Sequence, residues 1–174
     1  SKELWDHPLV QRFLDDEVSR ESMDFFGFRR WLASKPHWTP FRVEWSLCNE
    51  ELKVAGQLDS LWRDLDAGGE LVLVDWKRTR TLLTNDVAVL ERQSFGRVGF
   101  SLCSHLYDTA WSHYFIQQTL YAYLLASKYD LILRRAALVQ YHPSVCGGSF
   151  NEAPLEPDLA LAASLANAMQ GGGL

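Results

Sequence analysis

The sequence predicts an α/β (α+β) fold in which a central mixed β-sheet is flanked by helices. Two observations carry this prediction. Alternating or apolar segments between residues 41 and 77 are typical of strands, and residues 107–130 repeat apolar side chains at helical steps. Strands and helices that follow one another in this order form a mixed sheet covered by helices. A chain of 174 residues fits one domain, so we expect a single unit over 1–174.

The first half of the chain is expected to form a helical part followed by a three-stranded meander. Residues 1–35 carry apolar side chains at helical spacing and predict one or two helices, which Pro36 and Pro40 then end. From Phe41 the pattern alternates, and "FRVEWSL", "ELKVAGQLDSLWRD" and "ELVLVDWK" each read as a strand. Turn-forming residues separate them, so the three strands are expected to pair as neighbours.

The second half is expected to contain a long helix, a strand and a final helix. Residues 78–104 have weak periodicity and predict a connection with a short helix around "NDVAVLERQ". The strongest helix of the chain follows at 107–130, and "RRAALVQYHP" reads as a short strand. Residues 157–170 predict an Ala/Leu helix that opens near Pro157 and is closed by glycine.

Composition and charge exclude several classes of protein. A net charge of -5 argues against a binder whose affinity comes from phosphate neutralisation alone, although a metal site needs carboxylates and is compatible with it. Three dispersed cysteines predict neither a disulfide framework nor a zinc ribbon, which favours a reducing, intracellular compartment, whether nuclear, mitochondrial or cytoplasmic. No apolar run approaches ~18 residues, so we expect no membrane partner. The start at Ser1 suggests a piece of a larger chain or assembly.

Charged residues near two strand ends are the candidate reactive groups. Asp75 and Lys77 flank Trp76, and because strand side chains alternate, they are expected on one face with Trp76 on the other. Asp59 lies on the preceding strand, within reach of Asp75. Two carboxylates and a backbone carbonyl suit Mg²⁺, and a lysine beside them can position a water. The alternative is an ordinary ion pair at a strand end.

Three motifs in order resemble those of the PD-(D/E)XK nuclease superfamily. "GQLD" looks like its G-x-x-D motif, "DWK" like the (D/E)-x-K motif, and "QQTLY" like the Q-x-x-x-Y motif. The last motif points to the RecB-like and lambda-exonuclease-like branch, which includes mitochondrial genome maintenance exonucleases. The resemblance covers about 41–142 and implies that this part is a catalytic core with a restriction-endonuclease-like arrangement.

The resemblance also implies residue roles. Asp59 and Asp75 would bind Mg²⁺ or Mn²⁺ with help from the Trp76 carbonyl, and Lys77 would act on the attacking water. Gln117 and Tyr121 are four residues apart, so they share a helix face and would support the active strand or touch the substrate; alternatively they are a polar position and a core aromatic.

The activity implied by the resemblance is metal-dependent hydrolysis of phosphodiester bonds in DNA. Single-stranded DNA or DNA ends are the expected substrate, exonuclease action is favoured over endonuclease action, and DNA repair is the expected context. One alternative is an inactive nuclease-like binding or scaffold module of a larger repair or replication assembly. Another is a nuclease that acts on RNA.

Further metal ligands follow from the same resemblance. Glu44 on the first strand is an accessory candidate, or a solvated glutamate. His7 on the first helix is the candidate histidine ligand, with His37 as second choice, although a lone histidine is more often structural. His142 is expected to be structural. Some members hold an iron-sulfur cluster with four cysteines, and three dispersed cysteines exclude that cluster here.

Basic and aromatic residues near these motifs are candidates for contact with nucleic acid. Arg78 and Arg80, together with Arg92 and Arg97, would form a phosphate-contacting rim, or a solvated charged face. Trp111 and Tyr114 precede the Q-x-x-x-Y residues and would stack on single-stranded bases, or pack in the core.

Overall fold

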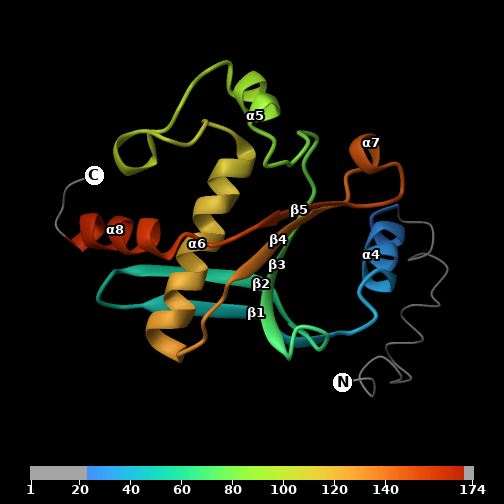
Figure 1. Ribbon diagram of the computed structural model, residues 1–174, viewed down its shortest axis with the longest axis horizontal. Coiled ribbons are helices and arrows are strands. Elements are labelled where there is room, and N and C mark those ends of the chain that lie inside the picture. Colours follow the sequence, from blue (N-terminus) through green and yellow to red (C-terminus); the bar gives the residue numbers. More distant parts are fainter. Residues whose placement is uncertain (1–22, 171–174) are drawn as a thin grey trace.

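The computed structural model describes residues 23–170 and contains a five-stranded mixed sheet with helices on it, in the order β1-β2-β3-β4-β5 (Figure 1). The strands are β1 (Trp38–Asn49), β2 (Val54–Asp64), β3 (Glu70–Lys77), β4 (Arg135–Gln140) and β5 (Asn151–Leu155). β3 and β4 are parallel, and the other neighbours are antiparallel. The predicted α+β class with a mixed sheet is confirmed.

The first three strands form the predicted meander. β1 lies at the edge of the sheet, where a proline is tolerated because no neighbouring strand needs its missing N–H. Pro40 lies in this strand, and the register with β2 shifts between Pro40 and Arg42. Gly68 and Gly69 have positive φ in the turn between β2 and β3, a conformation that glycine adopts without strain.

A long crossover joins the parallel strands β3 and β4. It contains α5 (Val87–Ser94), the short 3₁₀ helix η1 (Ser101–Cys103) and α6 (Ala110–Tyr129). Side chains cap both α-helices at their first turns: Asp86 accepts a hydrogen bond from Val89 N, and Thr109 accepts one from Ser112 N. The short helix expected around 85–93 and the long helix expected within 107–130 are both confirmed.

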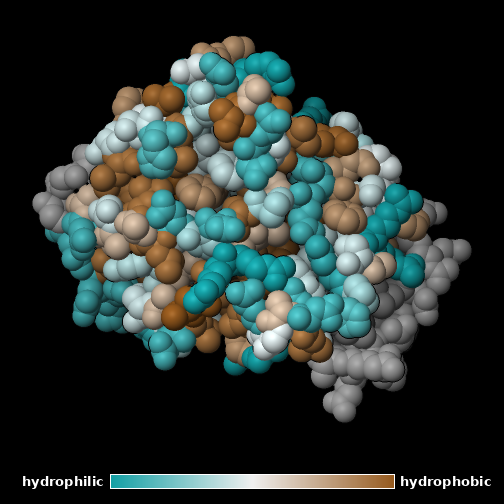
Figure 2. Space-filling view, viewed as in Figure 1, coloured by the Kyte–Doolittle hydropathy of each residue, from teal (hydrophilic) through white to brown (hydrophobic). Residues whose placement is uncertain are grey.

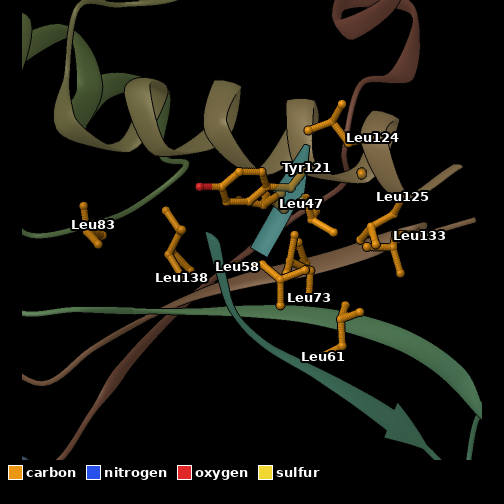
Figure 3. Close-up of a cluster of buried hydrophobic side chains, with 14 residues drawn as sticks. Leu47, Leu58, Leu61, Leu73, Leu83, Tyr121, Leu124, Leu125, Leu133 and Leu138 are labelled. Carbon is orange, nitrogen blue, oxygen red and sulfur yellow. The ribbon is translucent and has the colours of Figure 1, made fainter. Parts of the chain in front are cut away.

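Two apolar clusters cover the two faces of the sheet. Below α6, residues of β1 to β5 pack with Tyr121, Leu124 and Leu125, as Figure 3 shows. On the opposite face, α4 (Met23–Ala33) packs Trp31 among the tryptophans of the sheet. Successive residues of β3 alternate between these clusters, so the sheet has a helical layer on each face.

Some elements were not predicted, and part of the N-terminal prediction lies outside the described residues. β5, α7 (Pro143–Cys146) and η1 lack a repeating apolar pattern. β5 contains Pro154 and forms because it adds to the free edge of β4. α8 (Leu159–Gln170) confirms the C-terminal helix, and α4 confirms part of the helical region 1–35. Within 23–170, no helix is both long and apolar enough to cross a membrane.

Candidate active site

The candidate site lies where β2 separates from β3. The paired register of these strands ends at Ser60 and Val74, but β3 continues to Lys77 beside β4. Beyond the fork, the Trp76 N–H donates to Asp59 Oδ2 at 2.8 Å in place of a β2 carbonyl. This hydrogen bond brings Asp59 to the segment that carries Asp75 and Lys77.

A local irregularity in β2 produces the fork. Leu58 and Leu61 both belong to the cluster below α6 although they are three residues apart, so the side-chain alternation is interrupted between them. Ser60 lies between these two leucines. Its Oγ donates to Val74 O at 3.0 Å and accepts from Trp62 Nε1. These side-chain bonds stabilise the end of the ladder, where Asp59 leaves the regular pattern.

Asp75 and Lys77 lie on one face of β3, as the alternation predicts, and Trp76 packs on the other face. Lys77 Nζ is 2.5 Å from Asp75 Oδ2. Asp75 is only 2% exposed, and this burial raises the pKa of its carboxyl above the ordinary value, although Lys77 opposes the shift and Asp59 adds to it. The ammonium of Lys77 also lies 4.2 Å from the centroid of the Tyr114 ring, a cation–π distance.

Helix α6 places three polar side chains over this fork. Gln117 Nε2 donates to the Tyr121 hydroxyl at 3.3 Å, which confirms that the two share a helix face. Burial raises the pKa of Tyr121, and the charges of Asp75 and Asp59 raise it further, which places the phenol in the field of the carboxylates. Gln118 is fully buried and its amide lowers the pKa of Asp75, so it too lies beside that carboxylate.

The donor set of this site fits a divalent cation. Asp75 Oδ2 is buried, and its charged contact is the Lys77 ammonium. A second carboxylate, Asp59, lies beside it, and the carbonyl of Trp76 belongs to the same strand end. Residues 23–170 contain no group of three His, Cys, Asp or Glu side chains placed around one ion, but Mg²⁺ binds through one or two carboxylates and keeps several waters. The same oxygens suit Mn²⁺.

The additional candidate ligands form no three-residue metal group with the pair among residues 23–170. Glu44 lies opposite Asp59 in the register of β1 and β2, between the pairs Val43–Ser60 and Trp45–Leu58. It is exposed, has a positive φ of 48°, and accepts a 2.7 Å hydrogen bond from Gln57 Nε2. His37 is a correction: it precedes β1 at the opposite end of β2, where its Nδ1 is 3.8 Å from Asp66. His7 lies outside the described residues. His142 is buried and accepts a hydrogen bond from Ser144 N at the start of α7, a structural role.

The residues expected to contact nucleic acid differ in how far their side chains are already engaged within the protein. Arg78 follows Lys77 directly, but its guanidinium donates to Asp24 Oδ2 of α4 at 2.7 Å. Arg80 is exposed, as are the more distant Arg92 and Arg97. Trp111 is partly buried and stacks on Phe115, so one face of its indole is used in packing. The Tyr114 ring contacts the ammonium of Lys77, which is paired with Asp75.

Two positioning residues were missed by sequence reasoning. Gln140 at the end of β4 is fully buried and pairs with Lys77 in the strand register. Its Nε2 donates to Thr79 O at 2.6 Å and to Thr81 O at 2.9 Å, and its Oε1 accepts from Leu83 N. Asn151 Nδ2 donates to Leu83 O at 2.8 Å. Together they hold the segment that leaves the candidate site.

The arrangement combines two carboxylates, an ammonium group beside them, and a helix that supplies Tyr and Gln side chains. No protein-family model matches the chain, and no curated protein matches its sequence.

Proposed function

We propose that the protein is a metal-dependent nuclease that hydrolyses phosphodiester bonds of DNA, with single-stranded DNA or DNA ends as the substrate. The convergence of Asp59, Asp75 and Lys77 at the fork between β2 and β3 carries this proposal. The packing of the motifs also supports it, because Gly56 of the first motif lies against the Tyr121 ring of the third.

Each side chain has a role that follows from its place. Asp59 and Asp75 would hold Mg²⁺ or Mn²⁺, and the hydrogen bond from Trp76 N fixes the orientation of Asp59. When bound, the cation supplies charge stabilisation to the scissile phosphate and lowers the pKa of a water. Lys77 is held between Asp75 and the Tyr114 ring, where its ammonium can orient the attacking water or a phosphate oxygen.

Helix α6 supports this arrangement. Gln117 orients the Tyr121 hydroxyl, and the buried Gln118 lies beside Asp75. A buried carboxylate needs compensation for its charge, and Lys77 supplies only a part because the pKa of Asp75 remains raised. A divalent cation would supply the remainder, which is a physical reason for such a residue at this place.

End-labelled single- and double-stranded DNA and RNA test the proposal. We expect cleavage of DNA with Mg²⁺ or Mn²⁺ and none with EDTA, and a loss of about 10²–10⁴-fold in Lys77→Ala. Lys53→Ala is the matched control, because Lys53 is an exposed lysine in the turn between β1 and β2. Cleavage that persists in EDTA, or an unchanged rate in Lys77→Ala, would contradict the proposal.

Cleavage of RNA and not DNA would favour the alternative of a nuclease that acts on RNA. If no nucleic acid is cleaved, the alternative of an inactive binding or scaffold module is favoured. In that case Mg²⁺ should also fail to bind, which isothermal calorimetry measures independently of activity. Binding of Mg²⁺ without cleavage of any tested strand would retain the metal site and contradict the nuclease.

A further inference from the structure

A second surface lies on the crossover, next to the candidate active site. The chain between α5 and α6 runs out and back, and a single bridge joins Val98 to Tyr107. Two hollows, of about 490 Å³ and about 260 Å³, flank this bridge. Val98, Leu106 and Tyr107 line both of them. The larger hollow adds the polar side chains of Asn85 and His105 to these mostly apolar walls.

Two phenylalanines on the same segment are almost fully exposed. Phe95 is 87% exposed and Phe100 is 91% exposed, the highest values among the large hydrophobic residues described. Phe95 ends α5 with a φ of 56°, a left-handed conformation that normally favours glycine at this position. Ser101, after Phe100, has a φ of 51°. Packing explains neither ring, so both are candidates for contact with a ligand.

Two exposed arginines on this segment can contact an anionic ligand. Arg92 and Arg97 form no ion pair with a described residue, and Arg97 Nε donates to Ser94 O at 3.2 Å. Three carboxylates lie on the same segment: Asp86 caps α5, Asp108 is paired with His113, and Glu91 is exposed, so the arginines offer local phosphate contacts and not a net positive charge. Figure 2 shows apolar side chains interspersed with hydrophilic ones over the top of the molecule, where α5 lies.

Helix α6 connects this surface to the carboxylates. Ser112 lines both hollows, and two residues later Tyr114 contacts the ammonium of Lys77. Ile116 lines the smaller hollow and is followed by Gln117. Since a helix rises about 1.5 Å per residue, the hollows and the site lie at neighbouring levels along α6.

The geometry points to a binding surface for unpaired nucleobases, in which Phe95 and Phe100 stack on bases and the hollows beside Val98 receive them. A base has flat apolar faces and polar edges, which match apolar walls with a few polar groups. Arg92 and Arg97 would contact the phosphates of the same strand. This inference rests on the proposed function and makes it more specific, because double-stranded DNA offers no free base faces.

Fluorescence anisotropy with a labelled dodecathymidine in EDTA tests the inference without cleavage. We expect Phe95→Ala and Phe100→Ala each to bind about five- to a hundredfold more weakly than the unaltered protein, as loss of one stacked base predicts. Val98→Trp, which fills the hollows, should weaken binding similarly. Ile132→Ala is the matched control, because Ile132 is 61% exposed and follows the opposite end of α6. Circular dichroism and thermal unfolding of each variant verify its fold.

An oligonucleotide with abasic positions separates base stacking from phosphate contact. Removal of bases should weaken binding to the unaltered protein more than binding to Phe100→Ala, which retains only Phe95 and the hollows. Equal binding by all variants, equal sensitivity of Ile132→Ala, or no affinity for the strand would overturn the inference. So would self-association that Phe100→Ala abolishes while binding of the strand is unchanged, because the phenylalanines would then form a protein interface.

Cleavage with Mg²⁺, measured separately, shows which of the two proposals fails. Cutting without an effect of the phenylalanine variants retains the nuclease and removes the base-binding surface. Base-dependent binding without cutting under any metal condition retains the surface and removes the nuclease.

Discussion

Gly56 of β2 and Tyr121 of α6 approach so closely that a side chain at position 56 has no room. A Cβ there would lie 2.6 Å from Cε1 of Tyr121 and 2.9 Å from its hydroxyl oxygen. Figure 3 shows the Tyr121 ring between α6 and the leucines of the sheet. The contact joins the strand that carries Asp59 to the helix that carries Gln117, and it fixes the distance between these two elements.

Gly56→Ala should therefore destabilise the protein and disturb the site. The methyl group must displace the Tyr121 ring, and overpacking of this kind costs about 1–3 kcal/mol in the free energy of unfolding. Chemical denaturation of Gly56→Ala, Tyr121→Ala and the double variant measures the coupling. We expect the double variant to lose less stability than the sum of the two single variants, because removal of the ring relieves the clash.

Additive losses in that cycle would mean that the two residues act independently. Ala55→Gly in the unaltered protein is a control for the backbone, because Ala55 is the exposed neighbour of Gly56 on the same strand.

The ionisation of Asp75 should give the metal-free protein a characteristic pH dependence. Burial raises the pKa of Asp75 in the folded state above its value of 3.8 in the unfolded chain. The folded state therefore binds more protons between these two values, and stability that is fully present below pH 3.8 is lost as the pH rises through the folded pKa. Denaturation in EDTA over a pH series should show this loss in the unaltered protein and not in Asp75→Asn.

Asp64 is the matched control because its slope has the opposite sign. Burial acts to raise its pKa, but hydrogen bonds from Arg135 and from Ala67 N lower it below 3.8 overall. Its contribution to stability is present above that value and is lost as the pH falls through the folded pKa. Asp64→Asn should thus remove stability at neutral pH, and identical pH curves for the two asparagine variants would contradict this account.

The core of the site could be predicted from the sequence because its parts are local. Alternation along one strand places Asp75 and Lys77 on one face, and a four-residue step places Gln117 beside Tyr121. Gln140 could not be predicted, because its partnership with the segment after Lys77 depends on the parallel register of β3 and β4 across the long crossover. β5 could not be predicted either, since it exists only as an addition to the edge of β4.

Divalent cations should stabilise the protein through the carboxylate pair. A ligand that binds only the folded state stabilises it by about 2.7 kcal/mol at a hundred times its Kd. Titration with Mg²⁺ should therefore raise the melting temperature, and Asp59→Asn and Asp75→Asn should each reduce this rise. Glu44→Gln should keep it, because Glu44 is engaged with Gln57. A rise of equal size in all four proteins would show that the ion binds elsewhere.

Gln140 should control the order of the segment that leaves the site. Its side chain is fully buried and bonds Thr79 O, Thr81 O and Leu83 N, so Gln140→Leu leaves the buried Leu83 N and two partly buried carbonyls without this partner. The expected cost is about 1–3 kcal/mol in the free energy of unfolding. Hydrogen exchange at Leu83 N should accelerate more than exchange in the centre of β3.

Gln93→Ala is the matched control for this prediction. Gln93 Nε2 donates to Leu82 O of the same segment at 2.9 Å, but this is an exposed bond that water can replace. It should therefore change stability and exchange much less than Gln140→Leu. If both variants exchange alike, the segment is held by its own turns, and Gln140 would be a buried amide without a positioning role. If only Gln140→Leu accelerates exchange, the parallel register that places Gln140 opposite Lys77 also fixes the path of the chain out of the site.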